Sequence, residues 1–332
     1  MSIDGKRRGA RIAGTGHYLP EKVLTNSDFE KMVDTSDEWI VTRSGIRERR
    51  IASKDQAASD LAYEASLMAL EQAGTDPAHL DMIIVSTVTP DMPLPATGCI
   101  LQDRLGAKKA AGFDLSAACS GFVYGLSVAR SLIISGSMKK VLVVGVELLS
   151  KITDYEDRTT CVLFGDGAGA ALVEESGPEE GILSTFMRCD GSLGELLYLP
   201  GGGSRFPPSM EMIEKRQQYV KMRGNDLFKN AVRSMVDSAR RALNDAGLKA
   251  ADLDFLIPHQ ANIRIIEGVR KRLKLDMEQV VVNIDRVGNT SSASIPIALS
   301  ELDKGGTLKR GDLVMMVAFG GGLTWGSVLM RY

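Results

Sequence analysis

Cys119 is the residue whose position in the sequence points most directly to chemistry. It lies between a short predicted strand, which contains Phe113 and Leu115, and a predicted helix with apolar residues at helical spacing from Phe122 to Ile133. At the start of a helix, unpaired backbone N–H groups and the helix dipole favour a thiolate over a thiol. A thiolate is a nucleophile, so Cys119 is a candidate for covalent catalysis. A small buried residue packed in a turn is the competing interpretation, and the turn alone leaves both open.

His259 is a second candidate because of the strand that precedes it. A predicted apolar strand at residues 254–258 runs directly into His259-Gln-Ala-Asn262. Ligands of open parallel sheets bind at the carboxyl ends of the strands, and a histidine at such a place can exchange protons near neutral pH. The other two histidines, His17 and His79, are predicted to lie in surface loops.

Asn289 is a third candidate at a comparable place. A predicted strand at residues 281–285 leads into Gly288-Asn-Thr-Ser, which is expected to turn into another helix. Asn289 follows Cys119 by 170 residues. This separation is close to that of an internal repeat.

The repeat appears as a helix closed by glycine, a short loop and an apolar strand. Three matched pairs are each separated by 173 residues, namely Ala69 and Ala242, Gly74 and Gly247, and Leu80 and Leu253. Continuous apolar strands that alternate with helices are typical of parallel sheets buried on both faces. We therefore predict two similar halves, at residues 1–175 and 176–332. If the halves face each other about a pseudo-two-fold axis, Cys119 in the first can meet His259 and Asn289 in the second.

Composition excludes several classes of protein. With 44% hydrophobic residues, 25% charged residues and a net charge of −2, the chain is typical of a globular protein and not of a general nucleic-acid binder. No apolar run approaches the roughly 18 residues that span a bilayer, and the basic start has no apolar segment of a secretory signal after it. The cysteines are far apart, so we expect no disulfide framework, no metal site and a cytoplasmic location.

Three glycine-rich stretches are informative. The stretch that begins at Gly201 opens a loop excursion at residues 201–224, and Phe319-Gly-Gly-Gly322 can bring backbone N–H groups close to a ligand. Gly165-Asp-Gly-Ala-Gly169 lacks the G-x-G-x-x-G pattern and precedes an apolar run, which favours a close-packed strand over a nucleotide loop.

A predicted helix at residues 262–274 is strongly basic. It contains one acidic residue, Glu267, and five basic residues, namely Arg264, Arg270, Lys271, Arg272 and Lys274. A solvated face explains such a run, and so does a docking surface for an acidic or phosphorylated partner.

Six motifs together resemble the β-ketoacyl-acyl-carrier-protein synthase III family, the initiating condensing enzymes of type II fatty-acid synthesis. They are Glu38-Trp-Ile-Val-Thr-Arg-Ser-Gly-Ile46, the Ala-Cys-Ser-Gly turn at Cys119, Gly165-Asp-Gly-Ala-Gly169, His259-Gln-Ala-Asn262, Gly288-Asn-Thr-Ser and Phe319-Gly-Gly-Gly322. The resemblance covers residues 8–332. It implies a thiolase-like α/β fold, in which two pseudo-two-fold-related βαβαβαββ halves form a layered αβαβα core, and it implies a homodimer.

The resemblance also implies an acyltransferase mechanism. Cys119 would carry the acyl group, while His259 and Asn289 would bind the thioester carbonyl of the second substrate. The N–H groups of Cys119 and Gly321 would form the oxyanion hole. The implied reaction is a decarboxylative Claisen condensation of a short acyl-CoA, acetyl-CoA in the leading interpretation, with malonyl-acyl-carrier protein. It yields 3-oxoacyl-acyl-carrier protein, CoA and CO₂, and it needs no metal or other cofactor because the coenzyme A thioester is a substrate.

Further residues align with binding sites of that family. Trp39, Arg43 and Arg158 align with contacts to the nucleotide end of coenzyme A, and Lys229, Arg264, Lys271 and Arg272 with the carrier-protein dock. Leu94 aligns with a residue that crosses the dimer interface to wall the primer pocket, which Phe164 also lines. Asn289 disfavours thiolases, which use a second cysteine there, and elongating synthases, which use a second histidine. A secondary-metabolite ketosynthase with another primer and a non-catalytic acyl-binding scaffold remain as alternatives.

Overall fold

Nine strands are joined in the order β11-β12-β13-β8-β1-β7-β6-β4-β5. The computed structural model describes residues 7–332, so the start of the chain, residues 1–6, lies outside the described range. The strands of this sheet are β1 (Gly9–Tyr18), β4 (Met82–Ser86), β5 (Ala111–Leu115), β6 (Lys140–Leu148), β7 (Asp166–Ser176), β8 (Gly181–Cys189), β11 (Phe255–Pro258), β12 (Leu313–Gly320) and β13 (Thr324–Arg331). Two small sheets pair β2 (Lys22–Thr25) with β3 (Glu48–Ile51), and β9 (Leu197–Tyr198) with β10 (Lys221–Met222).

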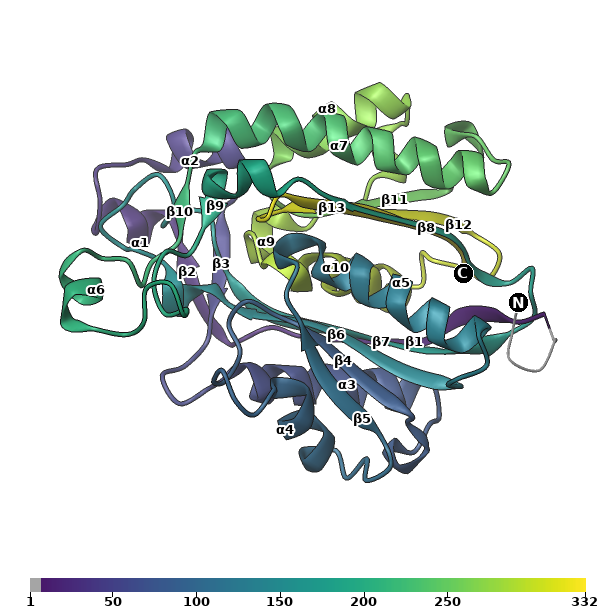
Figure 1. Ribbon diagram of the computed structural model, residues 1–332. Helices are drawn as coiled ribbons and strands as arrows, with labels where there is room; N and C mark the ends of the chain where they lie inside the picture. The colour runs from purple at the N-terminus through teal and green to yellow at the C-terminus, as the bar shows by residue number, and fades with distance from the viewer. Residues whose placement is uncertain (1–6) are drawn as a thin grey trace.

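The nine strands lie in two layers. β1 and β8 are joined by a single parallel pair, Ala10 with Gly181, and at this point the order passes from one half of the chain to the other. Figure 1 shows the two layers of strands one above the other, with helices above, between and below them. The helices are α1 (Asn26–Glu30), α2 (Asp37–Ser44), α3 (Ala58–Gln72), α4 (Thr97–Arg104), α5 (Gly121–Ile134), α6 (Met210–Glu214), α7 (Gly224–Asp245), α8 (Ile263–Leu273), α9 (Ile284–Val287) and α10 (Ser294–Lys304).

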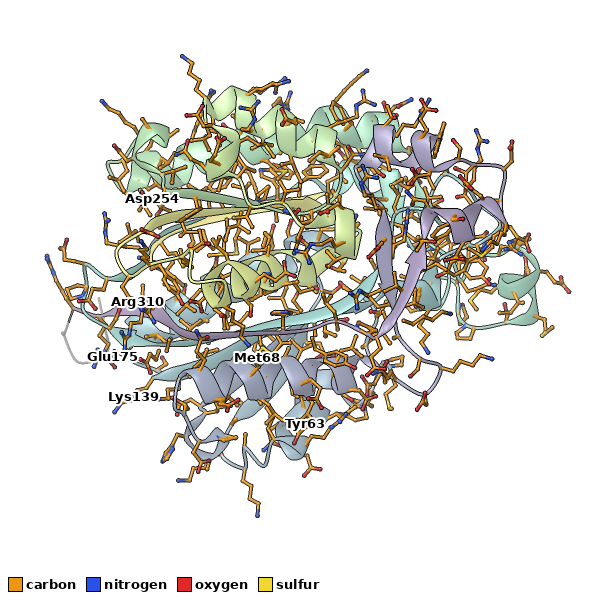
Figure 2. All side chains as sticks on the ribbon, turned by 180° about the vertical axis from the view of Figure 1, so that it is seen from behind. Tyr63, Met68, Lys139, Glu175, Asp254 and Arg310 are labelled. Atoms are coloured by element: carbon orange, nitrogen blue, oxygen red, sulfur yellow. The ribbon has the colours of Figure 1, made fainter. Side chains whose placement is uncertain are left out.

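The central layer consists of α5 and α10. Both helices are rich in small and apolar residues, and one buried cluster contains Phe122 of α5, Ile295 of α10 and strand residues of both layers. The outer layers are α3 and α4 on one side and α7 and α8 on the other (Figure 1). Side chains fill the space between the layers (Figure 2). The burial of most of α5 and of the first turns of α10 explains why these parts of the sequence are mostly apolar or small.

β7 packs closely against α10, as its glycine and alanine content predicts. A Cβ atom at Gly169 would lie 2.7 Å from the backbone nitrogen of Ile297, so a side chain there would collide with the helix backbone. The interpretation of residues 165–169 as part of a close-packed strand is confirmed, because β7 begins at Asp166.

Two expectations about local structure are wrong. The predicted strand at residues 281–285 is absent, and only Val280 bridges Leu256, because the Gln260 side chain bonds the Val281 carbonyl (3.1 Å) and the Asn283 N–H (3.1 Å) where a neighbouring strand would. The second half therefore has one strand fewer than the predicted βαβαβαββ pattern. His17 lies in β1 rather than in a surface loop, half-buried, with Nδ1 2.9 Å from Ser300 Oγ.

The excursion at residues 201–224 carries α6, which lies away from the stacked layers in Figure 1. Phe206, Met210 and Ile213 are exposed on it. Among the helices of residues 7–332, none has the length and apolar character needed to cross a membrane.

Candidate active site

Cys119 lies in a short 3₁₀ turn, Ala118–Ser120, between β5 and α5. Ala118 takes up a left-handed backbone conformation (φ +46°), which is uncommon for a residue with a side chain. The backbone of the final glycine run lies against the turn. A Cβ atom at Gly320 would lie 2.8 Å from the Cβ of Cys119, so only glycine fits there.

The expected thiolate is not the resting form of Cys119. Burial raises the pKa of the thiol to about 11, although hydrogen bonding from the Ser291 side chain and from the N–H groups of Cys119 and Gly321 lowers it. The helix terminus favours the thiolate, but removal of the side chain from water has the larger effect. Cys119 therefore rests as a thiol and must lose a proton before or during attack.

His259 is held in a fixed orientation at the end of β11. Its N–H donates to the Val317 carbonyl (2.8 Å), and its Nδ1 lies 2.7 Å from Ser294 Oγ. The Ser294 hydroxyl accepts the Gln260 N–H at 3.4 Å, so its own proton is free for Nδ1. This arrangement leaves the proton of the ring on Nε2. Burial lowers the pKa of His259 to about 3, so the ring is neutral and acts as a hydrogen-bond donor.

Asn289 is fixed through its backbone and its side-chain oxygen. Its N–H donates to the Leu163 carbonyl (2.9 Å) and its carbonyl accepts the Gly165 N–H (3.0 Å). Its Oδ1 accepts the Ser291 N–H at 2.9 Å. Because the oxygen is occupied in this way, the amide NH₂ group is left to donate to a ligand.

Cys119, His259 and Asn289 line one cavity of about 140 Å³. This catalytic cavity joins an inner cavity of about 290 Å³ at Cys119, Phe164 and Leu197, which line both. On the other side it joins an outer cavity of about 630 Å³, with five lining residues in common: Leu163, Met222, Gly224, Phe228 and Asn262. The three cavities form a path from the surface to Cys119 and beyond it.

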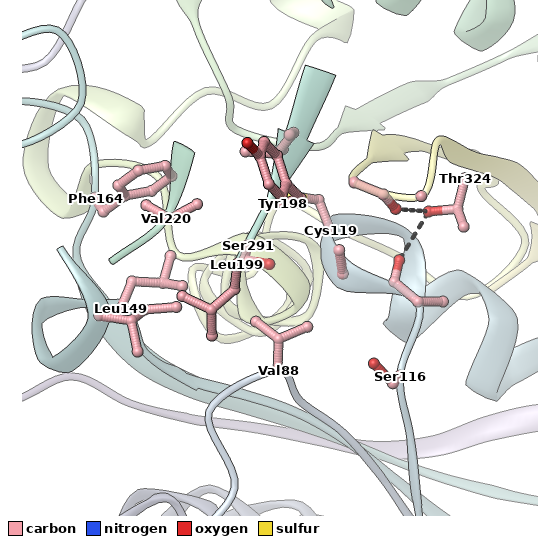
Figure 3. Close-up of a pocket in the computed structure, with 16 residues that line it drawn as sticks. Val88, Ser116, Cys119, Leu149, Phe164, Tyr198, Leu199, Val220, Ser291 and Thr324 are labelled. Carbon is pink, nitrogen blue, oxygen red and sulfur yellow. Dashed lines mark hydrogen bonds between the residues drawn. The ribbon is translucent and has the colours of Figure 1, made fainter. Parts of the chain in front are cut away.

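The inner cavity is largely apolar. Figure 3 shows Val88, Leu149 and Phe164 around it, with Cys119 and Ser291 at one side. Leu94, which the resemblance assigned to the primer pocket, is 85% exposed and does not line this cavity within one chain.

The outer cavity contains most of the predicted coenzyme A and carrier-protein contacts. Trp39, Arg43, Lys229 and Arg264 line it. The guanidinium carbon of Arg43 lies 4.8 Å from the centre of the Trp39 ring. Cations and a large aromatic surface at one mouth suit a ligand that carries phosphates and a flat ring system.

Three predicted contact residues lie outside this lining. Arg158 stands 5.3 Å from the Trp39 ring and bonds the Asp34 carbonyl at 2.6 Å, so it flanks the mouth. Lys271 and Arg272 lie at the exposed end of α8, where Lys271 is 3.6 Å from Glu267.

Sequence reasoning missed three polar residues around the site, namely Glu147, Ser291 and Ser294. The signal for Glu147 was a single carboxylate inside the apolar stretch from Val141 to Leu149. The serines gave no comparable signal, because serine is common in turns. Within residues 7–332 no group of three or more His, Cys, Asp or Glu side chains is arranged to hold a metal ion.

Two family models match the chain. Residues 113–191 match 3-oxoacyl-[acyl-carrier-protein] synthase III, and residues 243–332 match the C-terminal part of the same family. A β-ketoacyl-[acyl-carrier-protein] synthase III of Xanthomonas oryzae pv. oryzae is 56% identical, over 98% of this chain and 99% of that protein.

Solved structures are similar throughout the chain. The 3-oxoacyl-[acyl-carrier-protein] synthase III of Aquifex aeolicus is 52% identical, with a TM-score of 0.91 over 98% of this chain and all of that one. The priming β-ketosynthase of the R1128 polyketide pathway is 38% identical, with a TM-score of 0.91 over 98% of this chain and 96% of that one. These similarities confirm the predicted thiolase-like fold class.

Proposed function

This chain belongs to the 3-oxoacyl-[acyl-carrier-protein] synthase III family, and on that premise we propose how its three cavities share the reaction. It is an acyltransferase, a condensing enzyme that initiates fatty-acid synthesis and acts on malonyl-acyl-carrier protein and acyl-CoA. No cofactor takes part, since the coenzyme A thioester is a substrate. The observation that carries our proposal is the position of Cys119 at the junction of the inner and catalytic cavities.

In the first half-reaction, Cys119 takes the acyl group from coenzyme A. The thioester enters through the outer cavity, where Trp39, Arg43 and Arg158 hold its nucleotide end. The Cys119 sulfur attacks the carbonyl, and the N–H groups of Cys119 and Gly321 stabilise the oxyanion. The acyl chain then occupies the inner cavity.

In the second half-reaction, malonyl-acyl-carrier protein enters by the same path. Loss of CO₂ leaves an enolate, whose oxygen accepts hydrogen bonds from Nε2–H of His259 and from the amide of Asn289. The carbanion attacks the acyl group on Cys119 and releases 3-oxoacyl-acyl-carrier protein. Two neutral donors suit this step, because they stabilise negative charge without supplying a proton that would quench the carbanion.

We propose acetyl-CoA as the primer, which the similarity to the synthase III family favours. A cavity of about 290 Å³ with walls such as Val88, Leu149 and Phe164 accepts a small apolar group. We propose a homodimer in which Leu94, 85% exposed in the single chain, reaches the partner, as the resemblance to the family implies. A cytoplasmic location stays a prediction.

We assign the carrier-protein dock to the basic surface beside the mouth, which consists of Lys229, Arg264, Lys271 and Arg272. All four side chains are exposed, and Lys229 and Arg264 extend into the outer cavity itself. Cations there steer an acidic partner toward the path to Cys119.

A polyketide-priming role is the second candidate, because the R1128 priming ketosynthase is similar in fold and sequence. Primer length separates the two. The purified protein is incubated with acyl-CoAs of rising chain length and then with malonyl-acyl-carrier protein, and the products are identified by mass spectrometry.

We expect acetyl-CoA to give the largest acyl-enzyme signal, on the peptide that contains Cys119, and the fastest condensation. A preference for another acyl-CoA contradicts the assignment of acetyl-CoA and leaves the second candidate open. Absence of any acyl mass on wild-type protein contradicts the nucleophile assignment.

A further inference from the structure

Arg49 lies entirely inside the protein, although no reaction step above uses it. It belongs to β3, and it is the largest side chain among the described residues that is fully buried. Burial lowers the pKa of its guanidinium group to about 10, so the group keeps its charge near neutral pH. A buried charge is costly unless its donors are bonded, so the groups that Arg49 bonds indicate what it does.

The guanidinium group of Arg49 donates to uncharged oxygens on two sides. Nε donates to the Val162 carbonyl at 3.0 Å, and Nη2 donates to the same oxygen. Nη1 donates to Asn26 Oδ1 at 2.6 Å. Asn26 is itself fixed, because its amide donates to Asp37 Oδ1 at 2.7 Å and to the Ile46 carbonyl at 2.9 Å. The planar fork of an arginine thus holds the Val162 carbonyl with two donors, which a single ammonium group would not reproduce.

Val162 begins a segment, residues 162–164, that lines all three cavities. Val162 and Leu163 line the outer cavity, and Leu163 and Phe164 line the catalytic cavity. Phe164 also lines the inner cavity, as Figure 3 shows. Arg49 itself lines none of these cavities, so it holds the wall of the path without facing the path.

Asn289 is bonded to this same segment. Its N–H donates to the Leu163 carbonyl at 2.9 Å, and its carbonyl accepts the Gly165 N–H at 3.0 Å. In the described part of the chain, no backbone hydrogen bond joins Cys119 to residues 162–165. A displacement of the segment should therefore move Asn289 more than the nucleophile.

The aliphatic part of Arg49 supports the same place. A Cβ atom at Gly288 would lie 3.0 Å from Arg49 Cγ, and a Cβ atom at Gly165 would lie 3.4 Å from Arg49 Cβ. These two glycines are the residue before Asn289 and the residue that bonds its carbonyl. Arg49 therefore packs against both backbone stretches that hold Asn289.

We propose that Arg49 is a positioning residue for condensation, which holds the Val162 carbonyl and so fixes the segment that aims the Asn289 amide at the enolate oxygen. The inference rests on the proposed role of Asn289 as a donor to that oxygen. A role of Arg49 in stability alone predicts instead that its loss affects both half-reactions alike.

The test compares the two half-reactions in full-length Arg49→Met, which removes the donors and keeps much of the buried volume. Condensation is measured as product from preformed acetyl-enzyme and malonyl-acyl-carrier protein, and acylation as label from saturating acetyl-CoA. Both rates are expressed per labelled Cys119, so a smaller folded fraction does not alter the comparison. We expect condensation about 10–100-fold slower, as for a displacement of about 1 Å, and acylation less than about threefold slower.

Arg50→Met is the matched control, since Arg50 is the next residue of β3. Strand alternation directs it to the other face, where Nη1 donates to the Pro20 carbonyl at 3.2 Å. Both rates should stay near those of the wild type. Arg49→Lys keeps the buried charge without the fork, so its condensation rate should lie between those of wild type and Arg49→Met, with acylation again unaffected.

Asn289→Ala shows whether Arg49 acts through Asn289. In that background Arg49→Met should slow condensation by less than about a further threefold, because the group that it positions is already absent. Losses that multiply overturn the proposal. So does equal slowing of both half-reactions, or wild-type condensation in Arg49→Met and Arg49→Lys. Wild-type condensation in Asn289→Ala alone overturns the proposed role of Asn289 itself.

Discussion

The two halves of this molecule use the same turn for different purposes. In the first half Ala118–Ser120 precedes α5, and in the second Ser291–Ala293 precedes α10, again 173 residues later. The first residue of each turn is left-handed, with φ of +46° at Ala118 and +47° at Ser291. The shared strain shows that the turn geometry belongs to the fold rather than to the nucleophile.

What differs is the chemistry attached to that geometry. Cys119 corresponds to Ser292, which is buried and bonded to Glu147. At the same separation of 173 residues, His259 after β11 corresponds to Ser86, the last residue of β4. Under the proposed function, the first half supplies the nucleophile, beside a buried acid, and the second supplies neutral hydrogen-bond donors. The proposal therefore assigns acyl transfer to one half and stabilisation of the enolate to the other, although both halves share one fold.

The largest effect is expected when Cys119 is made like its counterpart. Cys119→Ser gives the first turn the hydroxyl of Ser292, and a serine here has no base strong enough to ionise it. We expect loss of at least about 10³-fold in acyl transfer, measured as label on the protein. The circular dichroism spectrum should be unchanged. A labelled serine at a comparable rate would contradict the comparison.

The next largest effect distinguishes the two halves, because substitutions in the second half should slow condensation but not acylation. His259→Ala or Asn289→Ala removes one donor to the enolate, for which we expect about 10²–10³-fold slower condensation. Acylation of Cys119 should change less than about threefold, because neither donor belongs to the oxyanion hole of that step. Acylation is measured by label and condensation by product release from preformed acyl-enzyme. Equal losses in both steps would show that the division between halves is wrong.

The sequence predicts well the α/β architecture on which this comparison rests. The constant separation of matched Ala, Gly and Leu residues indicates two α/β halves, and Cys119 and His259 follow strands as predicted, whereas the strand expected before Asn289 is absent. The strands and helices are predicted well because buried strands and glycine-closed helices depend mainly on local residue patterns. The predicted basic helix is likewise present as α8.

Failures of prediction occur where tertiary contacts replace local patterns. The apolar run at residues 281–285 forms no strand because Gln260, distant in sequence, takes its backbone bonds. The thiolate expected at Cys119 is not formed because burial outweighs the helix terminus. Neither effect can be read from nearby residues, because the bonds of Gln260 depend on the folding of the second half and the burial of Cys119 on the packing of both halves.

The third prediction concerns the effect of the buried Glu147 carboxyl in the first half on the free energy of unfolding. The pKa of Glu147 rises from 4.5 to about 7 on folding, so the folded protein holds more protons than the unfolded chain between these values. Stability from this group is therefore present below pH 4.5 and is lost as the pH rises through 7. At 1.36 kcal/mol per unit, the loss is about 3 kcal/mol at pH 8.

Glu147→Gln should thus stabilise the protein at pH 8 much more than at pH 5. The measurement is the difference in unfolding free energy between variant and wild type at each pH, by denaturant titration. Because His259 is common to both proteins, its own titration cancels in that difference. An equal difference at the two pH values would mean that folding leaves the pKa of Glu147 near 4.5.

The smallest expected effect comes from a substitution on α8, and it tests a difference in charge between the two outer helix layers. α8 has basic residues in its last turn, whereas α3 of the first half contains Asp60, Glu64 and Glu71 and no cation. Lys271→Glu places an acidic side chain on the surface beside the entrance of the outer cavity, so that this surface resembles α3 in charge. We expect KM for malonyl-acyl-carrier protein to rise about tenfold at low salt, with acylation by acetyl-CoA unchanged, because this exposed residue does not line the outer cavity.

Lys309→Glu is the matched control, since it also reverses one exposed lysine of the second half. Its neighbour Arg310 lies at the end of the molecule near the chain termini (Figure 2). The control should leave KM unchanged, and the effect of Lys271→Glu should shrink as ionic strength rises, since salt screens exposed charges. If both variants raise KM equally, the carrier protein responds to net charge, and the difference between the outer layers has no role in docking.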